Sequence, residues 1–161
     1  MNIDYKKQGK RNLAAGRLFE LKTRKDLELK GWIVSRWQNN IEWLSDNLKN
    51  NDFGNKEVAL GKCIQAKQGK FRKTSTGFPD FIIYKEKPIS NLMTYEVIFV
   101  ECKSNSYLSK EEKEKARFYL ENRYCSKFLI ASKYKEKGRI KIKYEDFYDK
   151  YSKSIKNCIS K

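Results

Sequence analysis

Two neighbouring stretches decide the fold: Gly77-Phe-Pro-Asp-Phe-Ile-Ile-Tyr84, and Val97-Ile-Phe-Val-Glu-Cys-Lys103 further along the chain. Each contains a run of apolar residues, mostly β-branched or aromatic, which is the composition of a β-strand. The segment between them, 85–94, contains proline and asparagine and suits the longish loop of a hairpin connection. We therefore expect two neighbouring strands, with charged residues where the first strand begins and where the second ends.

The rest of the chain predicts further helices and strands around this pair. Leucines spaced among good helix formers predict a helix over 10–30, with Gly31 as its stop. A Ser-x-x-Glu capping box at Ser109 opens another helix. The remaining expected elements are strands at 32–37, 128–131 and 140–144, and a terminal helix with Phe147, Tyr151, Ile155 and Ile159 on one face.

An insert at about 38–72 separates the first strand from the Gly77 stretch. Ile41, Leu44 and Leu48 have helical spacing and predict a short helix within it. Residues 58–66 fit either a second short helix or part of a strand, because their periodicity does not decide between the two.

Taken in order, these elements predict one α/β domain over residues 1–161, with a central mixed β-sheet flanked by helices. Its core covers 10–133, and a C-terminal strand and helix follow at 138–160. No internal repeat and no Pro/Gly/Ser-rich linker divides the chain.

Charge and composition limit the partners and the catalytic groups that this protein could use. The 161 residues include 36 Lys and Arg, 20 Asp and Glu and no histidine, for a formal net charge of +16. A folded domain this basic predicts a polyanionic partner, most simply nucleic acid. The missing histidine excludes Ser-His-Asp triads, Cys-His dyads, His-liganded zinc and nucleases with a histidine base. Hydrolytic chemistry would therefore rest on carboxylates, lysine and a metal with oxygen ligands.

Cysteine usage and apolar run lengths predict where the protein works. No two of the four cysteines are close enough in sequence for a CxxC pair, which favours reduced thiols in a cytosolic protein. The N-terminus shows no apolar signal-peptide core, and the longest apolar runs are only strand-sized. We therefore expect a cytoplasmic protein with no membrane partner.

Glu101 and Lys103 are separated by one residue at the end of a strand. Residues two apart in an extended chain point to the same face, so these side chains project together, while Cys102 points away and leaves its carbonyl near them. With Asp80 at the start of the preceding strand, the pattern predicts two carboxylates and an ammonium within a few ångströms. Taken alone, each motif also fits an ordinary turn or a simple ion pair. Together they indicate a site for Mg²⁺, because two carboxylates this close repel unless a hard cation lies between them.

Glu20 is a third acidic residue with an unusual position. It lies seven residues from both Leu13 and Leu27, a spacing that returns a helical side chain to nearly the same face. This predicts a partly buried carboxylate, which needs a positive partner. The simplest interpretation is a salt bridge to Arg17 or Arg24, three residues before and four after it.

These motifs resemble the PD-(D/E)XK nuclease superfamily, and within it the archaeal Holliday-junction resolvase and VRR-NUC-like branch. The similarity is carried by 77–80 and 100–104, with support from the Gly16-Arg-Leu-Phe-Glu20 helix, the Gly31-Trp-Ile-Val strand and the run Tyr107-Leu-Ser-Lys-Glu-Glu112. It covers about residues 10–133. The resemblance implies a restriction-endonuclease-like core, DNA as the partner, a role in repair or recombination, and a homodimer, since junction resolvases cut two strands symmetrically.

The resemblance also implies roles for individual residues. Asp80 and Glu101 would bind the metal, with Glu20 as the first-helix carboxylate near it, and the main-chain carbonyl of Cys102 would be a further ligand. Lys103 would be the catalytic lysine. The cofactor would be Mg²⁺, with Mn²⁺ as a substitute.

Basic residues directly before Asp80 are the candidate nucleic-acid contacts. A turn-rich loop carries Lys67, Lys70, Arg72 and Lys73, and such a loop beside a metal site would follow a phosphate backbone. We therefore expect a metal-dependent endonuclease acting on DNA, including branched substrates such as Holliday junctions or flaps. A nucleic-acid-binding module on a nuclease fold, with little or no catalysis, is the alternative. A basic structural protein whose carboxylates form only ion pairs is a third reading.

Overall fold

The computed structural model describes residues 5–44, 61–66, 77–90 and 92–151. A five-stranded sheet with the order β1-β4-β5-β6-β7 forms its centre, and a separate hairpin pairs β2 with β3. The strands are β1 (Ile33–Arg36), β2 (Asn39–Trp43), β3 (Gly61–Gln65), β4 (Phe81–Ile89), β5 (Leu92–Cys102), β6 (Lys127–Glu136) and β7 (Arg139–Asp146). The helices are α1 (Tyr5–Leu29), α2 (Lys110–Glu121) and α3 (Phe147–Tyr151).

The sheet is mixed, as predicted. β5 and β6 run parallel, with Glu101 opposite Ile130, and α2 lies between them in the chain as the crossover that a parallel pair needs. The other neighbouring pairs are antiparallel. Phe81 pairs with Val100, which sets the start of β4 beside the end of β5. This register brings Asp80 next to Glu101.

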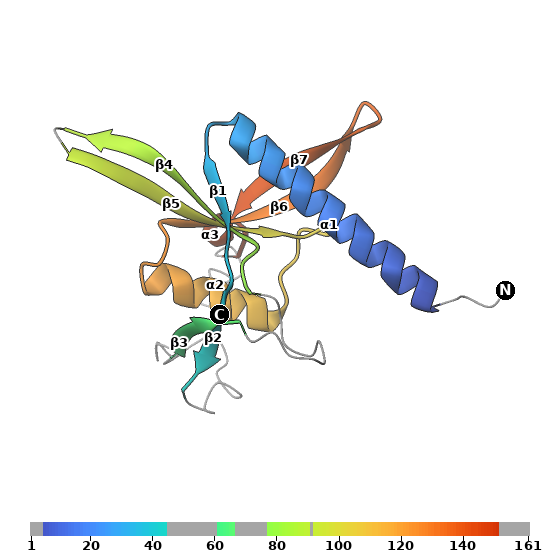
Figure 1. Ribbon diagram of the computed structural model, residues 1–161, viewed down its shortest axis with the longest axis horizontal. Coiled ribbons are helices and arrows are strands. Elements are labelled where there is room, and N and C mark those ends of the chain that lie inside the picture. Colours follow the sequence, from blue (N-terminus) through green and yellow to red (C-terminus); the bar gives the residue numbers. More distant parts are fainter. Residues whose placement is uncertain (1–4, 45–60, 67–76, 91, 152–161) are drawn as a thin grey trace, which may run out of the picture.

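Helices cover both faces of the sheet (Figure 1), so the domain has three layers. On one face, α1 packs through Phe19 and Leu27 onto Val100 and neighbouring β-branched residues. On the other, α2, α3 and the β2–β3 hairpin pack around Phe99 and other aromatic side chains. Because successive residues of a strand point to opposite faces, Glu101 shares the α2 side with Phe99.

The α1 helix is longer than predicted and buries a different stripe. It begins at Tyr5 rather than Lys10, and its buried residues are Phe19, Thr23 and Leu27, at i, i+4 and i+8. The leucines that marked the helix in the sequence lie mainly on its exposed side: Leu13, Leu18, Leu21 and Leu29 are all more than half exposed. Periodicity therefore identified the helix but not the face that packs.

The insert contains a strand where the sequence predicted a helix. Residues 39–43 form β2 and pair with β3, so the prediction from the spacing of Ile41 and Leu44 is wrong there, and Leu48 lies outside the described residues. Long-range pairing outweighs the local spacing because Ile41 is buried in the aromatic core. Gly61 permits this packing, since a Cβ there would lie only 2.9 Å from the Ile41 Cγ2 atom.

The strands β4 and β5 extend further than predicted. In place of a longish loop over 85–94, they remain paired from Phe81–Val100 out to Ile89–Leu92. Only their inner parts pair with β1 and β6, so residues 85–89 and 92–96 form a two-stranded β4–β5 arm that projects from the sheet, as Figure 1 shows. Its exposed apolar side chains are Ile89, Leu92, Met93 and Tyr95.

The remaining elements agree with the sequence where the structure describes them. The Ser109 capping box is present, and the strands predicted at 128–131 and 140–144 lie within β6 and β7. The terminal helix is described through Tyr151 only. Cys63, Cys102 and Cys125 are free thiols, and Cys158 lies outside the described residues. None of the described helices has both the length and the apolar character needed to cross a bilayer.

Candidate functional site

Asp80 is held in place by a close backbone contact between two segments. The Trp37 amide donates to the Asp80 carbonyl at 3.2 Å, and the Phe78 amide donates to the Asn39 carbonyl at 2.9 Å. Gly77 makes this approach possible, because a Cβ at that position would lie 2.5 Å from the Trp37 carbonyl oxygen. Any side chain at residue 77 would therefore push apart the two segments that position Asp80.

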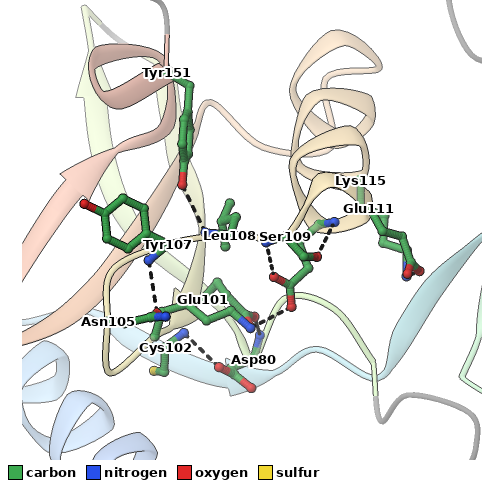
Figure 2. Close-up of polar contacts among 12 residues, drawn as sticks. Asp80, Glu101, Cys102, Asn105, Tyr107, Leu108, Ser109, Glu111, Lys115 and Tyr151 are labelled. Atoms are coloured by element: carbon green, nitrogen blue, oxygen red, sulfur yellow. Dashed lines mark hydrogen bonds and ion pairs between the residues drawn. The ribbon is translucent and has the colours of Figure 1, made fainter. Parts of the chain in front are cut away.

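The structure brings Asp80 and Glu101 together at the edge where β4 begins and β5 ends. The Asp80 amide donates to the Glu101 Oε2 atom at 3.1 Å, and the Asp80 Oδ2 atom accepts from the Cys102 amide at 2.8 Å. Figure 2 shows the Asp80 and Glu101 side chains close together, with the bond from Cys102 to Asp80 dashed. The sequence prediction that these two acids lie close together is confirmed. Their roles as metal ligands stay predictions.

The environment of this pair disfavours two full negative charges. Glu101 is only 6 % exposed, and burial followed by the neighbouring Asp80 raises the pKa of its carboxyl to about 8, despite the opposing effect of Lys103. Burial is also the largest influence on Asp80 and raises its pKa; the Glu20 carboxylate adds to this, and the Cys102 amide opposes it. A positive charge nearby would therefore favour the ionised forms of both acids.

Lys103 supplies part of that charge. Its Nζ atom lies 3.0 Å from Glu101 Oε1 and 2.6 Å from Glu112 Oε1. Burial disfavours the ammonium, but the two carboxylates outweigh burial and raise the pKa of Lys103, so it is fully protonated at neutral pH. Glu101 and Lys103 thus project side by side, as the spacing predicted.

Glu112 belongs to this cluster, although the sequence indicated only its capping role. Its Oε2 atom accepts from the Ser109 amide at 2.8 Å, and its Oε1 atom faces Lys103. Burial tends to raise the pKa of Glu112, but the bonds from Lys103 and Ser109 outweigh burial and lower it. The Ser-x-x-Glu pattern was the available signal, but it does not show how the first turn of α2 lies against β5.

Glu20 occupies the opposite face of the sheet and does not join the cluster directly. It is partly buried, as predicted, but its partner is Arg36 of β1 at 2.6 Å, not Arg17 or Arg24, and Arg24 pairs with Glu28 instead. Within the described ranges, no three or more Asp, Glu or Cys side chains are grouped so that they could hold a metal ion. Glu20 therefore influences Asp80 through charge, without completing a three-carboxylate set.

Cys102 contributes to the site through its backbone. Its amide donates to Asp80, while its side chain packs on the α1 side of the sheet, away from Glu101. Burial raises the pKa of this thiol and the Asp80 carboxylate adds to the shift, so Cys102 stays protonated at neutral pH. The predicted use of its carbonyl as a metal ligand stays a prediction.

The predicted nucleic-acid contacts Lys67, Lys70, Arg72 and Lys73 lie outside the described residues. The arrangement that is described comprises two adjacent acids and an ammonium fixed by a helix cap. Oxygen donors of this kind suit a hard divalent cation, and a fixed ammonium suits the stabilisation of developing negative charge. No protein-family model, curated protein or solved structure matches the chain.

Proposed function

We propose that the protein is a metal-dependent deoxyribonuclease with a PD-(D/E)XK-type site on a restriction-endonuclease-like core. The observation that carries the proposal is the convergence of Asp80, Glu101 and Lys103 where β4 begins and β5 ends, with Nζ of the lysine 3.0 Å from Glu101. Burying an acid beside a second acid destabilises the folded protein, and acids in such surroundings are concentrated at functional sites.

The residues present fit a divalent metal ion. Mg²⁺ commonly uses one or two protein carboxylates and completes its octahedral shell with water, so Asp80 and Glu101 are a sufficient protein contribution. Burial raises both pKa values, so a cation bound by the two groups would favour their ionised forms. We assign these two residues as the ligands of Mg²⁺, or of Mn²⁺ in its place. When bound, the ion would supply Lewis-acid stabilisation and a more acidic water.

The remaining chemistry belongs to the chain's own groups. Lys103 stays protonated, so in this proposal it stabilises negative charge on a phosphate rather than acting as a base. The Cys102 amide holds Asp80 in position through its 2.8 Å bond to the carboxylate. Glu20 adds negative potential from the α1 side, which favours cation binding at Asp80.

DNA is the substrate that the charge favours. The chain carries a net +16, and α1 has basic but no acidic residues between Tyr5 and Leu18. Basic side chains spaced along an exposed helix suit contacts with phosphates rather than with bases. The resemblance adds branched DNA, such as Holliday junctions and flaps, as the substrate form to test, and a homodimer as the assembly.

A nucleic-acid-binding module with little catalysis is the second candidate. It is favoured by one observation: Lys103 and Glu20 are each already paired within the protein, which satisfies them without a ligand. The two candidates differ in their need for metal. Binding through basic residues alone would be salt-sensitive and indifferent to EDTA.

The test is cleavage of labelled duplex, flap and four-way-junction DNA in Mg²⁺ or Mn²⁺, with and without EDTA. We expect metal-dependent products from the wild-type protein and none from Asp80→Ala or Glu101→Ala. Glu111→Gln is the matched control, because Glu111 pairs with Lys115 away from the cluster. Retained cleavage in Asp80→Ala would refute the assignment, and EDTA-insensitive binding without cleavage would support the second candidate.

A further inference from the structure

The Lys103 ammonium lies between two carboxylates that come from different elements. Glu101 belongs to β5, which ends directly before the lysine, whereas Glu112 belongs to the first turn of α2. The contact with Glu112 is the shorter of the two, at 2.6 Å against 3.0 Å. The helix, and not only the neighbouring acid on the strand, therefore fixes where the ammonium lies.

Glu112 is itself held by a reciprocal capping box. The Ser109 amide donates to Glu112 Oε2 at 2.8 Å, and the Glu112 amide donates to the Ser109 hydroxyl at 3.2 Å. Figure 2 shows Ser109 above Glu101 and Asp80. One carboxylate oxygen thus caps the helix while the other receives the lysine. The side chain cannot turn away from Lys103 without losing its bond to the helix terminus.

The two anchors of the lysine differ in what else they do. The Glu101 carboxylate also accepts from the Asp80 amide, and it lies against the second acid of the site. Any cation drawn to Asp80 and Glu101 would compete with Lys103 for the Glu101 carboxylate. Glu112 has no such competition, because its second oxygen is committed to the Ser109 amide.

We infer that Glu112 is a positioning residue that keeps the Lys103 ammonium beside Asp80 and Glu101, whatever else Glu101 binds. Its importance for catalysis rests on the proposed function, whereas the contact itself is a property of the folded chain. A lysine bonded to Glu101 alone would follow that carboxylate or leave it when a cation bound. With Glu112 in place, the ammonium keeps one strong, charge-assisted bond.

The chain offers two matched controls. Glu111→Gln removes the same charge from the same helical turn, but Glu111 is paired with Lys115 and does not contact Lys103. Ser109→Ala removes the hydroxyl half of the capping box and leaves the Glu112 carboxylate and the Ser109 amide. The first control shows whether loss of a negative charge from this helical turn is enough to affect Lys103. The second shows whether a weakened helix cap is enough when the contact between Glu112 and Lys103 is kept.

The primary experiment measures the rate at which an amine-acylating reagent modifies Lys103 in the metal-free protein, by peptide mass spectrometry. Exposed Lys110 serves as the internal reference. We expect Glu112→Ala to accelerate modification of Lys103 about tenfold relative to wild type, because a hydrogen bond between charged groups contributes about that factor. Glu112→Gln, which can still accept a hydrogen bond, should lie between the two, and Glu111→Gln and Ser109→Ala should match wild type.

Equal protection of Lys103 in Glu112→Ala and wild type would overturn the inference, as would equal acceleration in Ser109→Ala. Thermal unfolding of each variant checks that the fold is intact, and Glu112→Gln keeps the test valid where Glu112→Ala unfolds. In the cleavage assay, Glu112→Ala should lower kcat with little change in KM, with partial recovery in Glu112→Gln. Failure of the wild-type protein to cleave DNA would refute the proposed function, while the modification rates would still decide the role of Glu112.

Discussion

Glu101 and Glu20 are both paired with a basic side chain at the same end of the sheet, but they lie on opposite faces and in different surroundings. Glu101 is buried, touches Lys103 and lies against a second acid, Asp80. The Glu20 side chain is 25 % exposed, and its partner Arg36 is 62 % exposed. A basic partner alone therefore does not define a site. Burial and a neighbouring like charge distinguish the Glu101 side from the Glu20 side.

If the proposed function holds, the largest expected difference between the two faces is in DNA cleavage. Glu101→Gln should reduce DNA cleavage by about 1,000-fold, the upper range for removing one preorganised electrostatic group. Glu20→Gln should reduce it by about tenfold, because Glu20 acts on Asp80 only through charge. Single-turnover cleavage rates at saturating Mg²⁺ measure both. Equal losses for the two variants would show that both faces contribute directly to the site.

The second-largest effect is expected from a steric change at Gly77, beside Asp80. Gly77→Ala places a Cβ against the Trp37 carbonyl, where it would lie 2.5 Å away, so the backbone that holds Asp80 has to move. We expect a loss of about 3 kcal/mol in the free energy of unfolding, at the upper end of overpacking effects. Urea unfolding measures this loss. Gly16→Ala is the control, since a Cβ at Gly16 meets no atom within 4 Å.

Stability should depend on pH through Glu101. Its carboxyl has a pKa of about 8 in the folded protein against an ordinary value of 4.5, so between these values the folded state binds more protons than the unfolded state. The stabilisation that this difference gives the folded protein is therefore fully present below pH 4.5 and is lost as the pH rises toward 8. The free energy of unfolding falls by at most about 1.4 kcal/mol per pH unit. Urea unfolding of metal-free protein across this range should show the decrease. Glu101→Gln should remove most of this decrease and leave the smaller part that comes from Asp80, whose pKa is also raised. Glu20→Gln should keep most of it, and an unchanged slope in Glu101→Gln would assign the whole decrease to another group.

The smallest effect is expected for the ion pair between Glu20 and Arg36. Arg36→Ala removes the partner of Glu20, but an ion pair this exposed contributes only about 0.5 kcal/mol to stability. The measured loss should shrink further in high salt, because exposed charges are screened. A loss above about 2 kcal/mol would show that Glu20 is as dependent on its partner as a buried carboxylate.

Much of the Glu101 side could be predicted from the sequence, because its geometry follows from local rules. Alternation along a strand places Glu101 and Lys103 on one face, and pairing of two apolar runs sets Asp80 beside them. Glu112 was predicted as a helix cap from its spacing to Ser109, but its contact with Lys103 depends on how α2 crosses the sheet. No local pattern in the sequence records that crossing.

The Glu20 side was predicted less well, for a related reason. Helical spacing correctly indicated a partly buried carboxylate but favoured partners on the same helix. The actual partner, Arg36, comes from β1, which packs against α1 only in the folded domain. Likewise, Ile41 and Leu44 suggested a helix because their spacing is local, while the pairing of β2 with β3 joins segments far apart in the chain.

The β4–β5 arm has a practical consequence that follows from its limited pairing. Between 85 and 96 its two strands are hydrogen-bonded only to one another within the described sheet. Opening the arm therefore disrupts none of the ladder that positions Asp80, and its amide protons should exchange with deuterium well before those of residues 98–102. Exposed Ser90, which follows Ile89 at the end of β4, is accordingly a suitable place to insert a fluorophore or an affinity sequence without disturbing either face of the sheet.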